Sequence, residues 1–172
     1  MKHDRLTVAR GDVLDYSSVE SAVRGQDAVL CALGHKRFVI PSTILSRGTA
    51  HIVAAMEACR VRRLVCMTSL GIGDSWGRMG LLYGLFLEPL LLHFYFQDKE
   101  KQEKLIRESS LDWVIVRPGA LTNGPRRGAY RHGAGVGHWL WTVRISRADV
   151  ADFMLNQLGT TLYLRSAPGV SR

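Results

Sequence analysis

The sequence has only three cysteines and five prolines, and neither its cysteines nor its histidines are spaced as metal ligands. Cys31, Cys59 and Cys66 lie in apolar segments, are odd in number and form no CxxC pair. This pattern excludes a disulfide framework and is typical of a reduced compartment, so we expect a cytoplasmic protein. The six histidines are not grouped with thiols or carboxylates, so we expect no metal centre.

Long hydrophobic runs are also scarce. The first 15 residues contain no apolar signal segment. Residues 80–96 are strongly apolar, but Glu88 and Pro89 divide them into two runs, each shorter than the ~20 residues of a spanning helix. We therefore expect no membrane span and a segment that is buried or lines a pocket. If it were exposed, it would be an interaction patch.

The composition that remains is that of one globular domain with a basic surface. The chain has 172 residues, of which 47% are hydrophobic and 17 are glycine, and its net charge is +8. Such a charge suits an anionic partner, whether a phosphate-bearing cofactor, nucleic acid or an anionic membrane. The clustered arginines are not interleaved with aromatic residues, which favours solvated loops over specific nucleic-acid binding; they lie at positions 60, 62, 63, 126, 127 and 131.

Apolar runs typical of buried strands alternate with helical patterns along the chain. Strands are predicted at residues 6–10, 27–33, 63–67, 113–116 and 161–165. Helices are predicted from Ser18 to Gly25, from Ser42 through residue 56, at 98–109, and from Ser146, with Asp149 completing a capping box, to Gly159. This alternation predicts an α/β protein with a Rossmann-like, doubly wound parallel sheet.

In such sheets the ligand lies outside the carboxyl ends of the strands. Four predicted strands end in small, glycine-adjacent or hydroxyl residues: residues 11–13, 32–34, Thr68 with Ser69, and residues 117–120. Each glycine alone is explained by a turn, but four strand ends that agree predict a site for a flat ligand across this edge.

The order and spacing of these segments resemble a known family. They are GDVLD at 11–15, DAVLCALG at 27–34, RLVCMTSLG at 63–71 and LDWVIVRPGALT at 111–122. Together they are similar to the atypical short-chain dehydrogenases/reductases that bind NAD(P)H, especially NmrA-like proteins and flavin reductases of the biliverdin reductase B type. The resemblance implies one NAD(P)-binding domain over residues 1–172, with NADP favoured over NAD.

The resemblance also implies a placement of the cofactor, residue by residue. Asp12 and Val13 would meet the adenine, and the turn 32–34 (Ala32, Leu33 and Gly34) would pack under the adenine ribose and pyrophosphate. Thr68 and Ser69 would lie by the nicotinamide ribose. Pro118, Gly119 and Ala120 would flank the nicotinamide ring, where the cofactor itself carries the chemistry.

Tyr95 and Lys99 form a Y-x-x-x-K pair downstream of Ser69. In short-chain dehydrogenases this set relays a proton: the tyrosine donates it, the lysine lowers the tyrosine pKa and holds the ribose, and the serine orients the carbonyl. The alternative is that Tyr95 only belongs to the aromatic run HFYF, with Lys99 touching the ribose.

Two departures from the family pattern stand out. Relatives of the biliverdin reductase B type carry a histidine proton donor where this sequence has Ala120. In addition, no glycine-rich phosphate motif precedes residues 6–10, so the family pattern places the start of this chain at the third strand, without the first strand, the glycine-loop helix and the second strand. Either the sequence is truncated, or residues 6–10 pair with 27–33, or a second chain fills the slot; open sheet edges favour self-association.

Two functions therefore remain open. One is an NAD(P)H-dependent oxidoreductase that transfers hydride to a flavin, quinone, biliverdin-like or other planar or carbonyl acceptor. The other is an NmrA-like dinucleotide sensor or non-catalytic interaction protein, favoured by the absent glycine loop.

Overall fold

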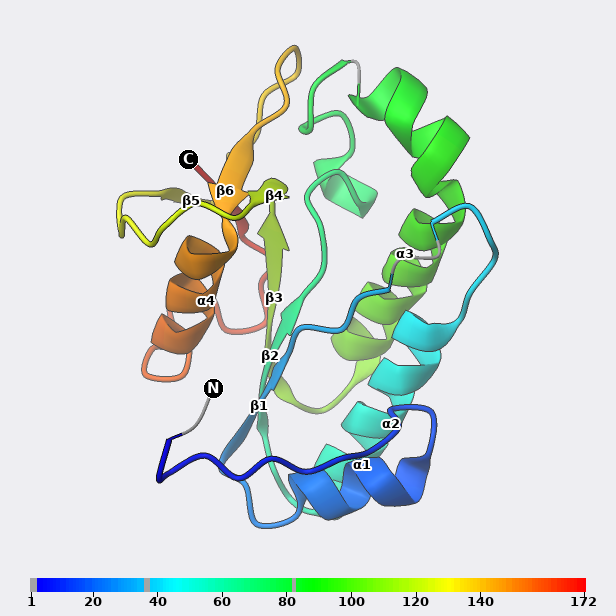
Figure 1. The fold of residues 1–172 in the computed structure, drawn as a ribbon, viewed down its shortest axis with the longest axis vertical. Helices are drawn as coiled ribbons and strands as arrows, with labels where there is room; N and C mark the ends of the chain where they lie inside the picture. The colour runs from blue at the N-terminus through cyan, green and yellow to red at the C-terminus, as the bar shows by residue number, and fades with distance from the viewer. Residues whose placement is uncertain (1–2, 36–37, 82) are drawn as a thin grey trace.

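A five-stranded sheet with the order β1-β2-β3-β7-β5 forms the centre of the computed structural model, which describes residues 3–35, 38–81 and 83–172 (Figure 1). Its strands are β1 (Ala28–Cys31), β2 (Arg63–Met67), β3 (Asp112–Pro118), β7 (Gly169–Ser171) and β5 (Arg131–Gly133). All neighbours pair in parallel except β5 and β7, which are antiparallel. A second, parallel pair consists of β4 (Ala120–Thr122) and β6 (Arg144–Ser146).

Helices cover both faces of the sheet, as Figure 1 shows. The helices α1 (Tyr16–Val23), α2 (Ile44–Ala58) and α3 (His93–Glu108) lie on one face, and α4 (Arg147–Asn156) lies on the other. The chain also contains a 3-10 turn, η1 (Gly73–Ser75), and a π-helix, η2 (Tyr83–Leu92), which leads into α3. The predicted Rossmann-like α/β fold is therefore confirmed.

The core explains why the central strands are apolar on both faces. Leu64 and Cys66 of β2 point into a cluster with α2 and α3, whereas Val65 points into a second cluster with α4. All three side chains are fully buried. A strand covered on both faces loses the usual apolar and polar alternation, which is the pattern that the sequence shows at 63–67.

The prediction of a strand at residues 6–10 is wrong. These residues are exposed and form no ladder, and β1 pairs only with β2 among the described strands. A strand requires a hydrogen-bonding neighbour, and β-branched composition alone does not supply one. The proposed pairing of 6–10 with 27–33 is absent, and a cavity of about 690 Å³, here called the edge cavity, lies between residues 9–13 and β1.

The end of the chain also differs from the prediction. Residues 161–165 form turns instead of a strand, and the last strand is β7. The N-cap of α1 is Asp15, which accepts from the Ser17 amide at 3.1 Å, whereas the predicted cap, Ser18, accepts from the Asp12 amide. The predicted capping of α4 is confirmed, since Ser146 accepts from the Asp149 amide at 3.0 Å.

Residues 80–96 are not broken at Pro89. The helix η2 continues through Pro89 with π geometry, in which the hydrogen-bond pattern that proline disrupts in an α-helix is already altered. Tyr83, Leu92 and Phe96 line a pocket, as expected for part of this segment. Most of the apolar surface of η2 is exposed instead of buried, which is the condition under which the sequence indicated an interaction patch. Within the described residues, no helix is both long enough and apolar enough to cross a membrane.

Candidate dinucleotide-binding site

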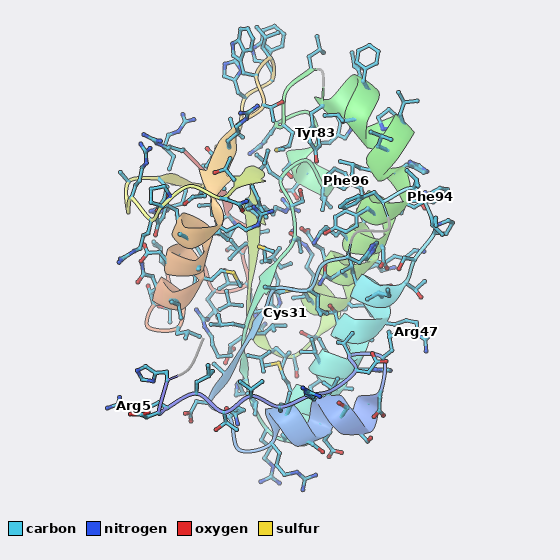
Figure 2. The ribbon with its side chains drawn as sticks, in the orientation of Figure 1. Arg5, Cys31, Arg47, Tyr83, Phe94 and Phe96 are labelled. Carbon is cyan, nitrogen blue, oxygen red and sulfur yellow. The ribbon has the colours of Figure 1, made fainter. Side chains whose placement is uncertain are left out.

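A cavity of about 740 Å³, here called the large cavity, opens at the carboxyl ends of β1, β2 and β3. The strand ends form its floor, and α3, η2 and the loop after β1 form its walls. Figure 2 shows Tyr83 and Phe96 on the side of η2 and α3 that faces the sheet, and Phe94 on the outer side. Most of the predicted site residues line this cavity: Leu33, Gly34, Thr68, Ser69, Tyr95, Lys99, Pro118, Gly119 and Ala120.

The residues predicted for the adenine side line the edge cavity instead. Asp12 and Val13 lie there, and Ala32 is exposed and lines neither cavity. The two cavities are neighbours, because a Cβ added to Gly48 would lie 2.8 Å from Val13 and 3.2 Å from Leu33. The predicted residues that line the two cavities therefore lie next to each other in the fold. The Asp12 carboxylate accepts from the Leu14 amide at 2.9 Å within its own turn.

Lys99 is the most unusual side chain of the large cavity. Its side chain is buried, 2% of the residue being exposed, and its Nζ has no hydrogen-bond partner in the described part of the chain. The amine lies 5.2 Å from the centre of the Tyr95 ring. Burial lowers the pKa of Lys99, and the nearby thiols and carboxylates oppose this only partly. A buried donor without a partner is costly to the free protein, so this amine fits a ligand with acceptor oxygens.

Tyr95 is not arranged as an activated proton donor. Its hydroxyl lies against Gly34, 3.7 Å from the Cβ that Gly34 lacks, and Lys99 lies over the ring instead of beside the oxygen. Burial, followed by the charge of Asp98, raises the pKa of Tyr95, whereas the dehydrogenase relay requires a lowered one. Ser69 lines the same cavity and donates to the Leu70 carbonyl oxygen at 3.0 Å.

Pro118, Gly119 and Ala120 lie at the junction of β3 and β4 and line the floor of the large cavity. At Gly119 the backbone passes so close to Val143 that an added Cβ would lie 2.7 Å from the Val143 carbonyl oxygen. The Gly119 amide donates to the Val170 carbonyl oxygen at 3.0 Å, which fixes this strand end to β7. Ala120 brings no proton donor to the floor.

A buried ion pair supports the floor from below. Glu103 accepts from the Arg117 Nε at 2.9 Å and Nη2 at 2.6 Å, and both side chains are at most 5% exposed. Glu103 also accepts from the Thr68 hydroxyl at 2.7 Å, so this hydroxyl points into the protein. Burial alone would lower the pKa of Arg117, but its bonds to Glu103 and Asp74 raise it. The pair holds α3 against the ends of β2 and β3.

Sequence reasoning missed Glu103 and Asp98. Glu103 follows Tyr95 and Lys99 at intervals of four residues, so the helical spacing places all three on one face of α3. Asp98 accepts from the Leu45 amide at 2.9 Å and thereby caps α2 together with Ser42, the possible cap that the sequence offered, which accepts from the Ile44 amide at 3.3 Å. The spacing of Glu103 from Tyr95 and Lys99 is a signal that the sequence contains. The contact of Asp98 with Leu45 spans 53 positions, so no local pattern predicts it.

Together, the parallel sheet, the small residues at its carboxyl edge and the buried amine define a Rossmann-type protein with a candidate ligand site at that edge. Within the described residues, no group of three or more histidine, cysteine, aspartate or glutamate side chains is arranged to hold a metal. The chain belongs to the NAD(P)H-binding family, whose sequence profile matches residues 1–161.

Two plant proteins are similar in sequence to this chain. An uncharacterized chloroplastic protein of Arabidopsis thaliana is 31% identical over 129 residues, which are 72% of this chain and 45% of that protein. The chloroplastic protein TIC 62 of Pisum sativum is 27% identical over 123 residues, 69% of this chain and 22% of that protein. The chain thus spans less than half the length of these curated relatives.

Solved structures share the fold. A short-chain dehydrogenase/reductase of Veillonella parvula, in complex with NADP, is 23% identical with a TM-score of 0.79 and covers 99% of this chain and 74% of its own. ChuY of Escherichia coli O157:H7, an anaerobilin reductase, is 22% identical with a TM-score of 0.72, over 94% of this chain and 72% of its own. The fold is therefore that of the short-chain dehydrogenases/reductases.

Proposed function

We propose that this protein is an NAD(P)H-dependent reductase that delivers hydride to a planar acceptor, such as a flavin, a quinone or a biliverdin-like compound. The observation that carries the proposal is the large cavity, which combines a floor of strand-end residues at 118–120 with the buried amine of Lys99, which has no hydrogen-bond partner among the described residues. Its volume of about 740 Å³ is of the size that small-molecule sites have.

In this proposal Lys99 donates to a ribose hydroxyl, and Pro118 and Gly119 support one face of the nicotinamide. The bound nicotinamide supplies the hydride. Met79, Tyr83 and Phe96 form an apolar wall opposite the floor, which excludes water and offers a planar acceptor a surface for stacking. Asp12 and Val13 then serve the adenine end along the sheet edge.

NADP is proposed over NAD because the net charge of +8 favours the more anionic coenzyme. Residues 1–172 are proposed to act as one NAD(P)-binding unit. A reductase of this kind oxidises NADPH in the presence of a soluble flavin or quinone, which the loss of NADPH absorbance measures. Cofactor binding without turnover on any of these acceptors would contradict the reductase proposal.

Replacing Tyr95 with Phe is expected to leave kcat within about twofold of the original value. The hydroxyl has a raised pKa and lies against Gly34, so we assign the proton of the reduced acceptor to solvent. Steady-state rates of both proteins between about pH 6 and about pH 9, where carboxyls are ionised and tyrosines are still protonated, check this. A drop of about a hundredfold or more in kcat, the size expected for a lost general acid, would place Tyr95 in the relay. Tyr130→Phe, which removes a tyrosine hydroxyl that bonds Asp152 and does not line the cavity, is the matched control.

The alternative is a dinucleotide sensor without catalysis. It is favoured by one observation, that the sequence contains no G-x-x-G-x-x-G motif to hold the pyrophosphate. A sensor would bind NADPH and change its association with other molecules, but it would oxidise no acceptor. Single-turnover mixing of the NADPH-loaded protein with excess flavin or quinone distinguishes the two functions, because only a reductase consumes the bound NADPH.

A further inference from the structure

Large apolar side chains are exposed together at one end of the molecule, in η2, in the loop before it and in the turn before β6. We call this surface the apolar rim. Leu90, Trp139 and Trp141 are 72%, 70% and 68% exposed. Soluble monomers seldom expose a continuous apolar patch above a few hundred Å² unless it binds something. The rim consists of Trp76, Leu81, Leu85, Phe86, Leu87, Leu90, Leu91, Phe94, Trp139, Leu140 and Trp141.

The segments of the rim are joined to each other. Met79 and His138 form a parallel β-bridge, and the His138 amide donates to the Arg78 carbonyl oxygen at 2.9 Å. Gly80 lies against the Trp141 backbone, since an added Cβ would be 2.6 Å from its carbonyl carbon. Figure 1 shows these loops and η2 at the same end of the molecule. The rim is therefore one surface.

The segments of the rim also border the large cavity on one side. Met79, Tyr83 and Leu92 belong to the same segments and line that cavity. Figure 2 shows Tyr83 on the inner side of this region and Phe94 on the outer side. Whatever covers the rim therefore lies at the entrance to the proposed acceptor site.

Charge and residue type indicate an anionic lipid surface as the partner. The sequence has one acidic residue between positions 76 and 97, Glu88, and none between 126 and 148, where five arginines lie. Arg144 and Arg147 are exposed; Arg144 follows Trp141 by three residues, and Arg147 lines the large cavity together with Tyr83 and Leu92. Tryptophan prefers the interface of a bilayer, and each nearby arginine adds about 1 kcal/mol of attraction to an anionic leaflet. Two copies of this basic surface would repel each other.

We propose that the apolar rim docks the protein on the surface of an anionic membrane, with the entrance of the large cavity facing the lipid. The rim leucines, phenylalanines and tryptophans enter the headgroup region, and Arg144 and Arg147 contact anionic headgroups. No helix of the described residues spans the bilayer, so the association is peripheral. This placement also assigns a lipophilic acceptor, such as a long-chain quinone dissolved in the membrane. The acceptor, unlike the docking, rests on the proposed reductase function.

Vesicle binding without cofactor tests the docking separately from the reductase function. The full chain is mixed with vesicles of phosphatidylcholine alone or with about 30% phosphatidylglycerol, a leaflet of strong negative potential, and is sedimented. We expect sedimentation with the anionic vesicles and about tenfold less bound protein for Leu85→Gln/Leu90→Gln. Leu155→Gln/Leu162→Gln is the matched control, since these leucines are 57% and 71% exposed, against 54% and 72%, and lie away from the rim.

Tryptophan fluorescence gives an independent measurement. The sequence has four tryptophans, of which Trp113 is buried, so the three of the rim dominate any change on binding. A blue shift with anionic vesicles supports docking. Three results would each overturn the proposal. They are wild-type protein that stays in the supernatant with both kinds of vesicle, an equal loss of vesicle binding in the two double variants, and a wild-type dimer that dissociates in Leu85→Gln/Leu90→Gln but not in the control variant. Docking without any NADPH binding would refute the reductase function alone.

Discussion

Replacing Lys99 with Met is expected to stabilise the protein by about 1–3 kcal/mol and to weaken NADPH binding at least about tenfold. The Lys99 amine is buried without a hydrogen-bond partner in the described residues, and Met fills a similar volume without a polar atom to desolvate. Binding weakens because the same substitution removes the donor proposed for the ribose. The two effects have opposite signs, which a merely structural lysine would not produce.

Urea unfolding and an NADPH titration measure these two effects on the same preparation. Lys104→Met is the control, because Lys104 lies on the same helix with an exposed side chain and, among the described residues, forms an ion pair only with Glu108. We expect this control to retain the NADPH affinity of the original protein. A Lys99→Met variant that unfolds more easily and binds NADPH normally would show that the amine has a structural partner and no cofactor role.

The pH dependence of stability follows from the same residue. Burial lowers the pKa of Lys99 in the folded protein below the value of 10.5 that it has when unfolded. Between these two pKa values the unfolded chain binds more protons, so Lys99 makes the free energy of unfolding rise with pH through this window. The Lys99→Met variant is expected to lack this contribution.

Replacing Arg117 with Met is expected to lower the free energy of unfolding by about 3–5 kcal/mol, a large share of the usual total for a domain. The substitution removes both hydrogen bonds of Arg117 to the buried Glu103 carboxylate. Among the described side chains, Glu103 then keeps the Thr68 hydroxyl and the partly exposed Arg107 guanidinium, which lies 3.6 Å away. The end of β3 then loses its ion pair with α3, so NADPH affinity is also expected to fall.

Two further variants test whether the loss of stability arises from the buried carboxylate of Glu103. Arg117→Met/Glu103→Leu removes both charges and is expected to recover more than half of the lost stability, about 2 kcal/mol or more. Arg62→Met breaks an ion pair with Asp112 in which the Arg62 side chain is 66% exposed, and little change is expected. Equal losses in the Arg117 and Arg62 variants, measured by urea unfolding, would contradict the role of burial.

The sequence predicted the central strands because their information is local. Residues 63–67 form β2 with the predicted bounds, since an apolar run covered on both faces needs no distant partner to be recognised. Ser146 caps α4 as predicted, because the cap and its acceptor lie three residues apart. The small residues at the strand ends lie together because parallel strands share one carboxyl edge.

The errors arise where the outcome depends on contacts distant in sequence. Residues 6–10 have strand composition but no neighbouring strand, and Asp98 caps a helix from 53 positions away. The exposure of η2 was equally invisible, because an apolar run indicates burial whether or not the fold covers it. In the site, the pairing of Glu103 with Arg117 depends on how α3 packs against β3.

The most direct test of the central claim is a calorimetric titration of the purified chain with NADPH and NADH, each repeated on Lys99→Met. We expect one binding event per chain, tighter for NADPH, with a dissociation constant below about 1 mM for the original protein and at least about tenfold higher for the variant. The absence of binding of either coenzyme up to millimolar concentrations, or equal affinities in both proteins, would contradict the assignment of the large cavity to the nicotinamide half of the cofactor.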